Sequence, residues 1–234
     1  MIKALVFDCG GVFVKPTTGD WLLAPGFEEI LGHDFLEKHM PDFRRVRGGY
    51  QHLLPDTNRM DTDDEECAMF AQYFDAIFRE IGIALTREQL SRLSHIQTFV
   101  DGRYVFFDDV MPFLRKWRKT YKLGIVSDAP PSTRRILSAK GVLSLIDGAT
   151  FSCDLGVLKP DPRIFEATLA KLGVLPEEAV FVDDFPSKLR GGVNIGMHGV
   201  QMRRPMPELF HMPPEWGGPL VHDFTELDAY LQSL

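Results

Sequence analysis

The sequence predicts an α/β fold, in which helices cover both faces of a doubly wound parallel sheet and an all-helical segment is inserted near the amino terminus. Short apolar runs that are typical of strands buried on both faces occur at residues 4–7, 122–126 and 179–182. Helical patterns lie between and after them, at residues 110–120, 132–140 and 164–172. Strands that alternate with helices in this way indicate a parallel sheet.

The helix predicted over residues 164–172 has the clearest boundaries. Asp161 and Pro162 precede it as a cap and a first-turn proline, and Gly173 follows it. A last helix is expected over residues 225–234.

The segment 16–106 interrupts the alternation of strands and helices. It contains no convincing strand, and amphipathic helices are expected at residues 27–39, 63–81 and 86–99. We interpret the aromatic stripe of the second helix as packing rather than as a ligand site. The predicted organisation is therefore a core of residues 1–15 and 107–234 with a helical insertion of residues 16–106.

The composition excludes several classes of function. The chain has 26 Lys and Arg against 33 Asp and Glu, a net charge of −7, which argues against binding to nucleic acid or to an anionic membrane. Only four apolar residues precede Asp8, too few for a signal peptide, and no run approaches the length of a membrane span. Cys9, Cys67 and Cys153 are widely spaced and predict reduced thiols. We therefore expect a cytoplasmic monomer or homodimer.

Polar residues that are candidates for catalysis or metal binding lie at the carboxyl ends of the predicted strands. These residues are Asp8, Ser127, Asp128, Asp183 and Asp184. Ligands of an open parallel sheet bind outside the carboxyl ends of its strands, so we expect these side chains at one edge, together with Lys159. Buried carboxylates this close repel one another unless a cation lies between them.

The cation that suits carboxylates, a carbonyl and a substrate phosphate is Mg²⁺. Metal and Lys159 together cancel the repulsion between Asp8 and a phosphate dianion, so that Asp8 can attack phosphorus and form an aspartyl-phosphate. Ser127 and the backbone N–H groups of the turn at Gly10 and Gly11 are expected to bind the other phosphate oxygens.

Four segments carry a family resemblance. They are VFDCGGV (residues 6–12), IVSD (125–128), GVLKPDPRIF (156–165) and VFVDD (180–184). In order and spacing they resemble the motifs of the haloacid dehalogenase-like (HAD) superfamily, in its phosphatase branch with a helical cap. The last two segments are similar to those of sugar-phosphate phosphatases and of the amino-terminal phosphatase domain of epoxide hydrolases. The resemblance covers about residues 1–14 and 107–202, and it implies a Rossmann-like core, a cap domain and a small phosphorylated metabolite, such as a sugar phosphate, as substrate.

The resemblance also implies roles in the metal site. Asp8 matches the nucleophile and a metal ligand, Asp183 matches the second metal carboxylate, and the backbone carbonyl of Gly10 matches the third protein ligand. Asp184 is either a further residue of the metal site or a partner for Lys159.

The phosphate site is expected to involve Gly10, Gly11, Ser127, Asp128 and Lys159. Ser127 and Lys159 match the phosphate-holding pair of the family and, with Asp8, are the expected catalytic residues. Two interpretations of Asp128 stay open: it caps the loop, or it disfavours dianionic groups beside Ser127.

One position departs from the family pattern. Many of these phosphatases have an aspartate two residues after the nucleophile, which protonates the leaving alcohol and then activates water, but this chain has Gly10. Because positioned proton transfer contributes ~10²–10⁴ in rate, the chain recruits another group, uses good leaving groups or has lost turnover. From Gly10 we expect a preference for anomeric sugar phosphates or acyl phosphates over primary phosphate esters.

The insertion offers three candidates for the missing acid, which are Asp20, His33 and His39. Ordinary structural roles, as a turn or cap residue for Asp20 and as half-exposed helix positions for the histidines, are the simpler interpretation. A basic cluster either forms a solvated face or recognises a distal substrate charge; its members are Arg44, Arg45 and Arg47. Alternation along the first strand points Cys9 away from the site.

Three rival functions are weighed against the phosphatase. A metal-free haloacid dehalogenase would use the same nucleophile on carbon, but the paired Asp183 and Asp184 argue against it. A phosphomutase would need acid-base help to return the phosphoryl group. A phosphate-binding regulatory protein with little or no turnover would agree with Gly10 and with residues 205–219, a proline-rich segment that we interpret as a surface loop or a partner surface.

Overall fold

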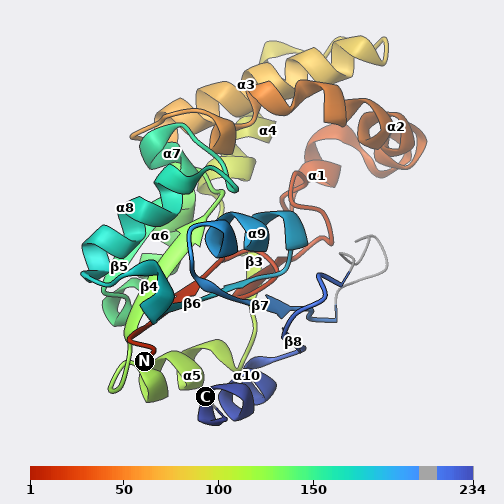
Figure 1. Ribbon diagram of the computed structural model, residues 1–234. Coiled ribbons are helices and arrows are strands. Elements are labelled where there is room, and N and C mark those ends of the chain that lie inside the picture. The colour runs from red at the N-terminus through yellow and green to blue at the C-terminus, as the bar shows by residue number, and fades with distance from the viewer. Residues whose placement is uncertain (206–214, 234) are drawn as a thin grey trace.

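A six-stranded parallel sheet lies at the centre of the computed structural model, which describes residues 1–205 and 215–233 (Figure 1). The strand order is β5-β4-β1-β6-β7-β8. The strands are Ala4–Phe7 (β1), Lys122–Ser127 (β4), Gly148–Phe151 (β5), Ala179–Asp183 (β6), His198–Met202 (β7) and Leu220–Val221 (β8). All neighbouring pairs are parallel, so the predicted α/β fold is confirmed.

The position of the central strand β1 explains why its sequence is apolar throughout. β4 and β6 flank it on either side, and all four of its residues are fully buried. Leu5 and Phe7 belong to the hydrophobic cluster on one face of the sheet, whereas Ala4 and Val6 belong to the cluster on the other. A strand buried on both faces therefore shows no alternation of polar residues.

Helices cover both faces of the sheet. One face carries α5 (Val110–Trp117), α6 (Pro131–Ala139) and α10 (Phe224–Gln232), and the other carries α8 (Pro162–Leu172) and α9 (Pro186–Asn194). A short helix, α7 (Ser152–Leu155), follows β5. The predicted cap of α8 is confirmed, since the Asp161 carboxylate accepts a hydrogen bond from the backbone N–H of Arg163 and Gly173 ends the helix at φ 66°.

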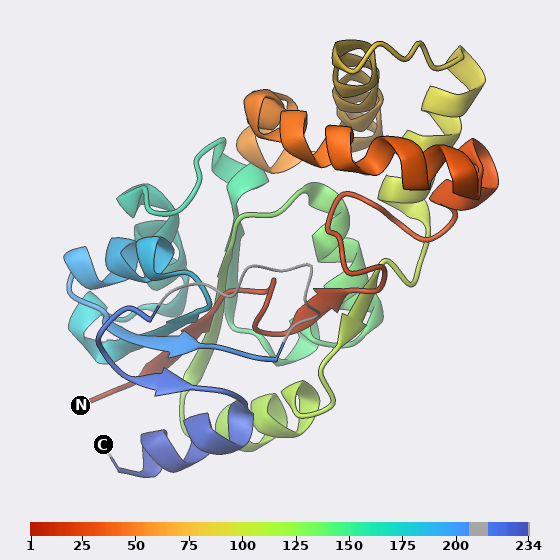
Figure 2. The same ribbon diagram turned by 90° about the vertical axis from the view of Figure 1, so that its right-hand side faces the viewer.

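The cap, residues 16–106, forms a separate helical layer with its own hydrophobic cluster (Figures 1 and 2). It contains α1 (Phe27–Leu31), α2 (His33–Val46), the 3₁₀ helices η1 (Arg47–Leu53) and η2 (Pro55–Thr57), α3 (Asp63–Glu80) and α4 (Arg87–Phe99). The single helix predicted over residues 27–39 is wrong in its boundaries. Gly32, at φ 87°, separates α1 from α2, because this backbone conformation does not fit an α-helix. None of the described helices has both the length and the apolar character needed to cross a bilayer.

A two-stranded antiparallel ribbon, which the sequence did not indicate, joins the core to the cap. It pairs β2 (Val14–Pro16) with β3 (Tyr104–Phe106). The prediction that the insertion holds no strand is therefore wrong at both of its ends. Strands of three residues are too short to show a periodic pattern, and Pro16 ends β2.

A buried polar contact docks the cap on the core. Glu66 of α3 is fully buried, and its carboxylate accepts hydrogen bonds from the backbone N–H (2.8 Å) and the hydroxyl (2.7 Å) of Ser132 in α6. The guanidinium of Arg103 donates to the same hydroxyl (2.7 Å) and lies 3.5 Å from the carboxylate. Burial raises the pKa of Glu66, whereas Arg103 and Ser132 act to lower it.

Replacing Glu66 tests this contact. We expect Glu66→Ala to lower the free energy of unfolding by about 3–5 kcal/mol, because it leaves the guanidinium of Arg103 buried without a counter-ion. The matched control on the same helix is Asp75→Ala, which removes an exposed i,i+4 pair with Arg79 and should cost less than about 1 kcal/mol. Chemical denaturation measures both values, and equal losses in the two variants would contradict a docking role for Glu66.

Candidate active site

The carboxyl ends of three adjacent strands bring the predicted site residues together. Asp8 follows β1, Ser127 ends β4 and Asp183 ends β6. Phe7 is in register with Val182 of β6, so Asp8 and Asp183 come level with each other across the strand pair. The sheet thus fixes these side chains at one edge, as the sequence predicts.

Lys159 lies between two carboxylates. Its ammonium is 2.9 Å from Oδ1 of Asp8 and 2.6 Å from Oδ2 of Asp183, and it also donates to the carbonyl of Val126 (3.2 Å). The Ser127 hydroxyl donates to the same Oδ1 of Asp8 (2.6 Å). The side chains of Lys159 and Asp183 are fully buried, so their charges interact with little screening by solvent.

Three carboxylates form a group at this edge. Each of Asp8, Asp183 and Asp184 contributes one oxygen, and these oxygens lie within 4.8 Å of one another. Burial acts to raise the pKa of Asp8, but the attraction of Lys159 and Lys188 outweighs it and lowers that pKa. Burial and the repulsion from Asp183 and Asp8 raise the pKa of Asp184 well above its ordinary value. A hard divalent cation such as Mg²⁺ fits this donor set, because its charge would relieve the repulsion.

Asp128 holds the loop that carries Lys159. Its Oδ1 accepts a hydrogen bond from the backbone N–H of Lys159 (2.8 Å), and its Oδ2 forms an ion pair with Lys188 (2.9 Å). These contacts favour the loop-cap interpretation of Asp128. Lys188 is a site residue that the sequence analysis missed. The signal that could have found Lys188 is its position four residues after Asp184. It lies there in the first turn of α9, on the side of the strand ends.

The turn after the nucleophile departs from one prediction. The backbone N–H of Gly11, which was expected to bind phosphate, donates instead to the carbonyl of Val14 (2.9 Å) within the turn. Gly11 has φ 71°, and a Cβ on it would lie 2.3 Å from Oδ2 of Asp184. Its role is therefore to leave room for the Asp184 carboxylate. A Cβ on Gly10 would lie 3.3 Å from the indole of Trp21, so this ring packs closely over Gly10.

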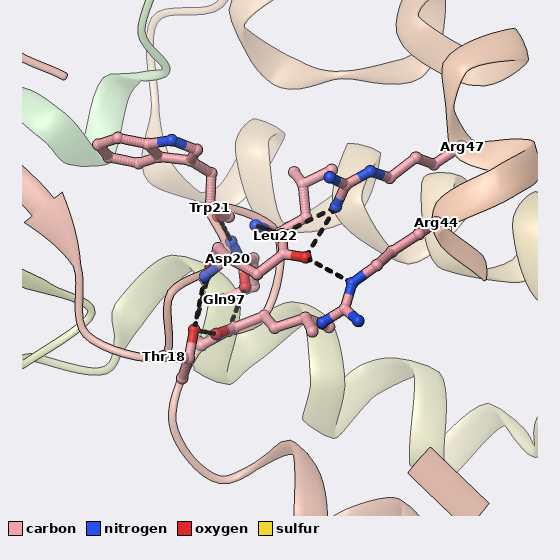
Figure 3. Close-up of polar contacts among 9 residues, drawn as sticks. Thr18, Asp20, Trp21, Leu22, Arg44, Arg47 and Gln97 are labelled. Carbon is pink, nitrogen blue, oxygen red and sulfur yellow. Dashed lines mark hydrogen bonds and ion pairs between the residues drawn. The ribbon is translucent and has the colours of Figure 1, made fainter. Parts of the chain in front are cut away.

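Asp20 is a structural anchor rather than a free acid (Figure 3). Both of its carboxylate oxygens accept hydrogen bonds from Arg47 (2.8 and 2.9 Å), and one also accepts from Arg44 (3.3 Å). The backbone N–H of Leu22 donates to the other oxygen (3.1 Å). Asp20 thereby ties the segment that enters the cap to α2 and η1, and it occupies two of the three arginines of the basic cluster.

The other candidates from the cap have surface contacts. His33 is exposed and forms a hydrogen bond with Glu28 (3.0 Å), and His39 is half-buried beside the ring of Phe35. Arg45 pairs with the exposed Asp42 (2.9 Å). In the core, Cys9 is buried in the hydrophobic cluster, and burial raises the pKa of its thiol, which Ser127 acts to lower. Of the predicted loop over 205–219, residues 206–214 lie outside the described part of the chain.

Comparisons with known proteins agree with this arrangement. The sequence model of one family, haloacid dehalogenase-like hydrolase, matches residues 2–196. Phosphatase MT3486 of Mycobacterium tuberculosis is 27% identical over 209 residues, which are 87% of this chain and 88% of that protein. Glyceraldehyde 3-phosphate phosphatase of Methanopyrus kandleri is 31% identical over 140 residues, 57% of this chain and 59% of that protein.

A solved structure has the same fold over the whole chain. L-2-haloacid dehalogenase from Xanthobacter autotrophicus superposes with a TM-score of 0.73 at 19% identity, with 100% of both chains covered. Some curated relatives are much longer proteins, and the matched segment spans as little as 6% of their length.

Gly11 provides a test of the carboxylate group. We expect Gly11→Ala to weaken Mg²⁺ binding by about 10–100-fold, because the new methyl group displaces Asp184. Isothermal titration calorimetry with MgCl₂ measures this change. The control is Gly82→Ala: Gly82 has a similar φ of 79° but nothing within 4 Å of its Cβ position, so only the backbone strain of roughly 1–2 kcal/mol is introduced. Unchanged Mg²⁺ affinity in Gly11→Ala would show that Asp184 does not take part in metal binding.

Proposed function

Because the chain belongs to the haloacid dehalogenase-like hydrolases, we propose that it is a Mg²⁺-dependent phosphatase of small phosphate monoesters, such as sugar phosphates. The observation that carries the proposal is the group of three carboxylates with the ammonium of Lys159 against two of them. The two relatives named as phosphatases support the same reaction class.

The nucleophile of the proposed reaction is Asp8. Ser127 and Lys159 both contact its Oδ1, so we assign the attack on phosphorus to Oδ2. The attack forms an aspartyl-phosphate and breaks the bond between phosphorus and the ester oxygen. Water then attacks this acyl phosphate, releases inorganic phosphate and restores the carboxylate.

The site neutralises the charge that collects during this reaction. Mg²⁺ held by Asp8, Asp183, Asp184 and the carbonyl of Gly10 would offset the repulsion between the nucleophile and the phosphate dianion. Lys159 is fixed by its ion pairs and supplies a second positive charge without reorganisation. The backbone N–H of Gly10 makes no hydrogen bond to the described residues, so it is available to a phosphate oxygen.

A metal-free dehalogenase shares the fold but is disfavoured by the electrostatics of this site. Dehalogenation also begins with attack by an aspartate, yet here Asp183 and Asp184 would remain beside the attacking carboxylate, with Lys159 and Lys188 nearby but no metal ion between the three acids. Two buried carboxylates this close to Asp8 raise the cost of ionising all three groups together. We therefore favour phosphorus over carbon as the electrophile.

A panel of phosphate esters assayed with and without Mg²⁺ tests the proposed function. We expect phosphate release that requires Mg²⁺ and that falls by a factor on the order of 10⁴ or more in Asp8→Asn, since the nucleophile is lost. The control Asp101→Asn changes an exposed carboxylate on the cap and should keep full activity.

Two outcomes would contradict the phosphatase. Chloride release from 2-chloropropionate without metal would identify a dehalogenase. Phosphate binding with no turnover of any ester would identify a binding protein.

A further inference from the structure

A small cavity lies where the cap meets the core. Its volume is about 140 Å³. The cap side contributes Trp21, Leu22, Leu54, Pro55, Asp56, Phe70 and Gln97, and the rest of the lining is Arg103, Tyr104, Asp128 and Pro130. Two of its lining residues also belong to the surroundings of the proposed site: Asp128 accepts a hydrogen bond from the backbone N–H of Lys159, and Trp21 packs over Gly10.

Asp56 has an unsatisfied carboxylate oxygen in this lining. It lies in η2, and its Oδ1 is buried without a hydrogen-bond partner among the described residues. A buried oxygen with no partner costs about 1–3 kcal/mol unless water or a ligand group meets it, so this atom at the cavity wall is available to a group that enters the cavity. Asp20, the other buried carboxylate of the cap entrance, has both oxygens occupied by arginines.

The surroundings of Asp56 raise its pKa, so that part of it stays protonated at slightly acidic pH. Burial, followed by repulsion from Asp128, raises the pKa of Asp56 to about 6, and Lys188 counteracts this effect. Burial is the main cause of the raised pKa values of Tyr73 and Tyr104, and the charge of Asp56 adds to it. An acid with a pKa near the working pH is suited both to give up and to take back a proton.

Asp56 lies on the same cavity as the ring that covers Gly10. Gly10 offers no side chain for proton transfer, and the indole of Trp21 fills the adjacent space. The same indole and Asp56 line one cavity. The ammonium of Lys188 acts on the pKa values of both Asp8 and Asp56, so it lies within electrostatic reach of the nucleophile and of the cap carboxylate.

We propose that Asp56 is the general acid and base of this enzyme and takes the role that Gly10 cannot perform. When Asp8 attacks and the phosphorus–oxygen bond of the ester breaks, the proton of Asp56 passes to the leaving oxygen and the alcohol departs. The resulting carboxylate then takes a proton from the water that attacks the aspartyl-phosphate. Phosphate is released, and Asp56 is protonated as before. This inference rests on the proposed phosphatase function.

A leaving-group series tests the role of Asp56. In Asp56→Asn we expect kcat/KM for alkyl phosphates to fall by about 10²–10⁴, while 4-nitrophenyl phosphate, whose leaving group needs no proton, reacts almost as in the unmodified enzyme. The preference for good leaving groups, which Gly10 alone would predict for the unmodified chain, should on this proposal appear mainly in the variant. The matched control is Asp42→Asn, an exposed cap carboxylate paired with Arg45.

Chemical rescue separates proton transfer from structure. In Asp56→Ala, added formate should restore part of the hydrolysis of alkyl phosphates, since a small acid can enter the space left by the side chain. Thermal unfolding checks that both variants fold; the neutral Asn removes repulsion from Asp128 and should not lower the midpoint.

The outcomes distinguish the two proposals. Equal losses for alkyl and aryl phosphates in Asp56→Asn, or no rescue by formate, would overturn the role of Asp56 and leave the phosphatase intact. No hydrolysis of any phosphate ester by the unmodified protein would overturn the proposed function itself.

Discussion

The ammonium of Lys159 is the interaction on which the rest of the site depends. Two apolar strands end in carboxylates that the sheet places side by side, and both carboxylates are shielded from water. A buried carboxylate pair is stable only where opposite charge lies against it. Lys159 contacts both groups, and Asp128 holds the backbone of the loop that carries Lys159. The core therefore holds a positive charge in place for an anion before any substrate binds.

The sequence predicts most of this arrangement because its signals are local. Continuous apolar runs indicate buried parallel strands, and the residues that follow them must meet at one edge of the sheet. The helices predicted over residues 63–81 and 86–99 match α3 and α4 closely. The break between α1 and α2 and the three-residue strands β2 and β3 were beyond this reasoning. They depend on one glycine conformation and on pairing between residues 88 or more apart, neither of which produces a periodic pattern.

Predictions about individual polar groups failed where tertiary contacts determine their hydrogen-bond and ion-pair partners. The N–H of Gly11 was expected to face phosphate, but it closes the turn, and the glycine is required by the Asp184 carboxylate. Lys188 joins the site through an ion pair across the sheet edge. In the cap, Asp20 was identified from the sequence as a candidate acid, whereas Asp56 was not. Only the structure shows that arginines satisfy the first and that an oxygen of the second is left without a partner.

A proton donor on the cap would link chemistry to the position of that domain. An acid two residues from the nucleophile is present whether the cap is open or closed, whereas Asp56 reaches the leaving group only when the cap lies on the core. The buried contact of Glu66 with Ser132 and Arg103 holds the two parts in this docked arrangement. Closure would then exclude water from the acyl phosphate and supply the proton at the same time, so that a substrate must allow the cap to dock before its ester bond is broken. Selectivity would follow from the fit of the leaving group beneath Trp21 and Asp56, which the cap sequence controls independently of the core motifs.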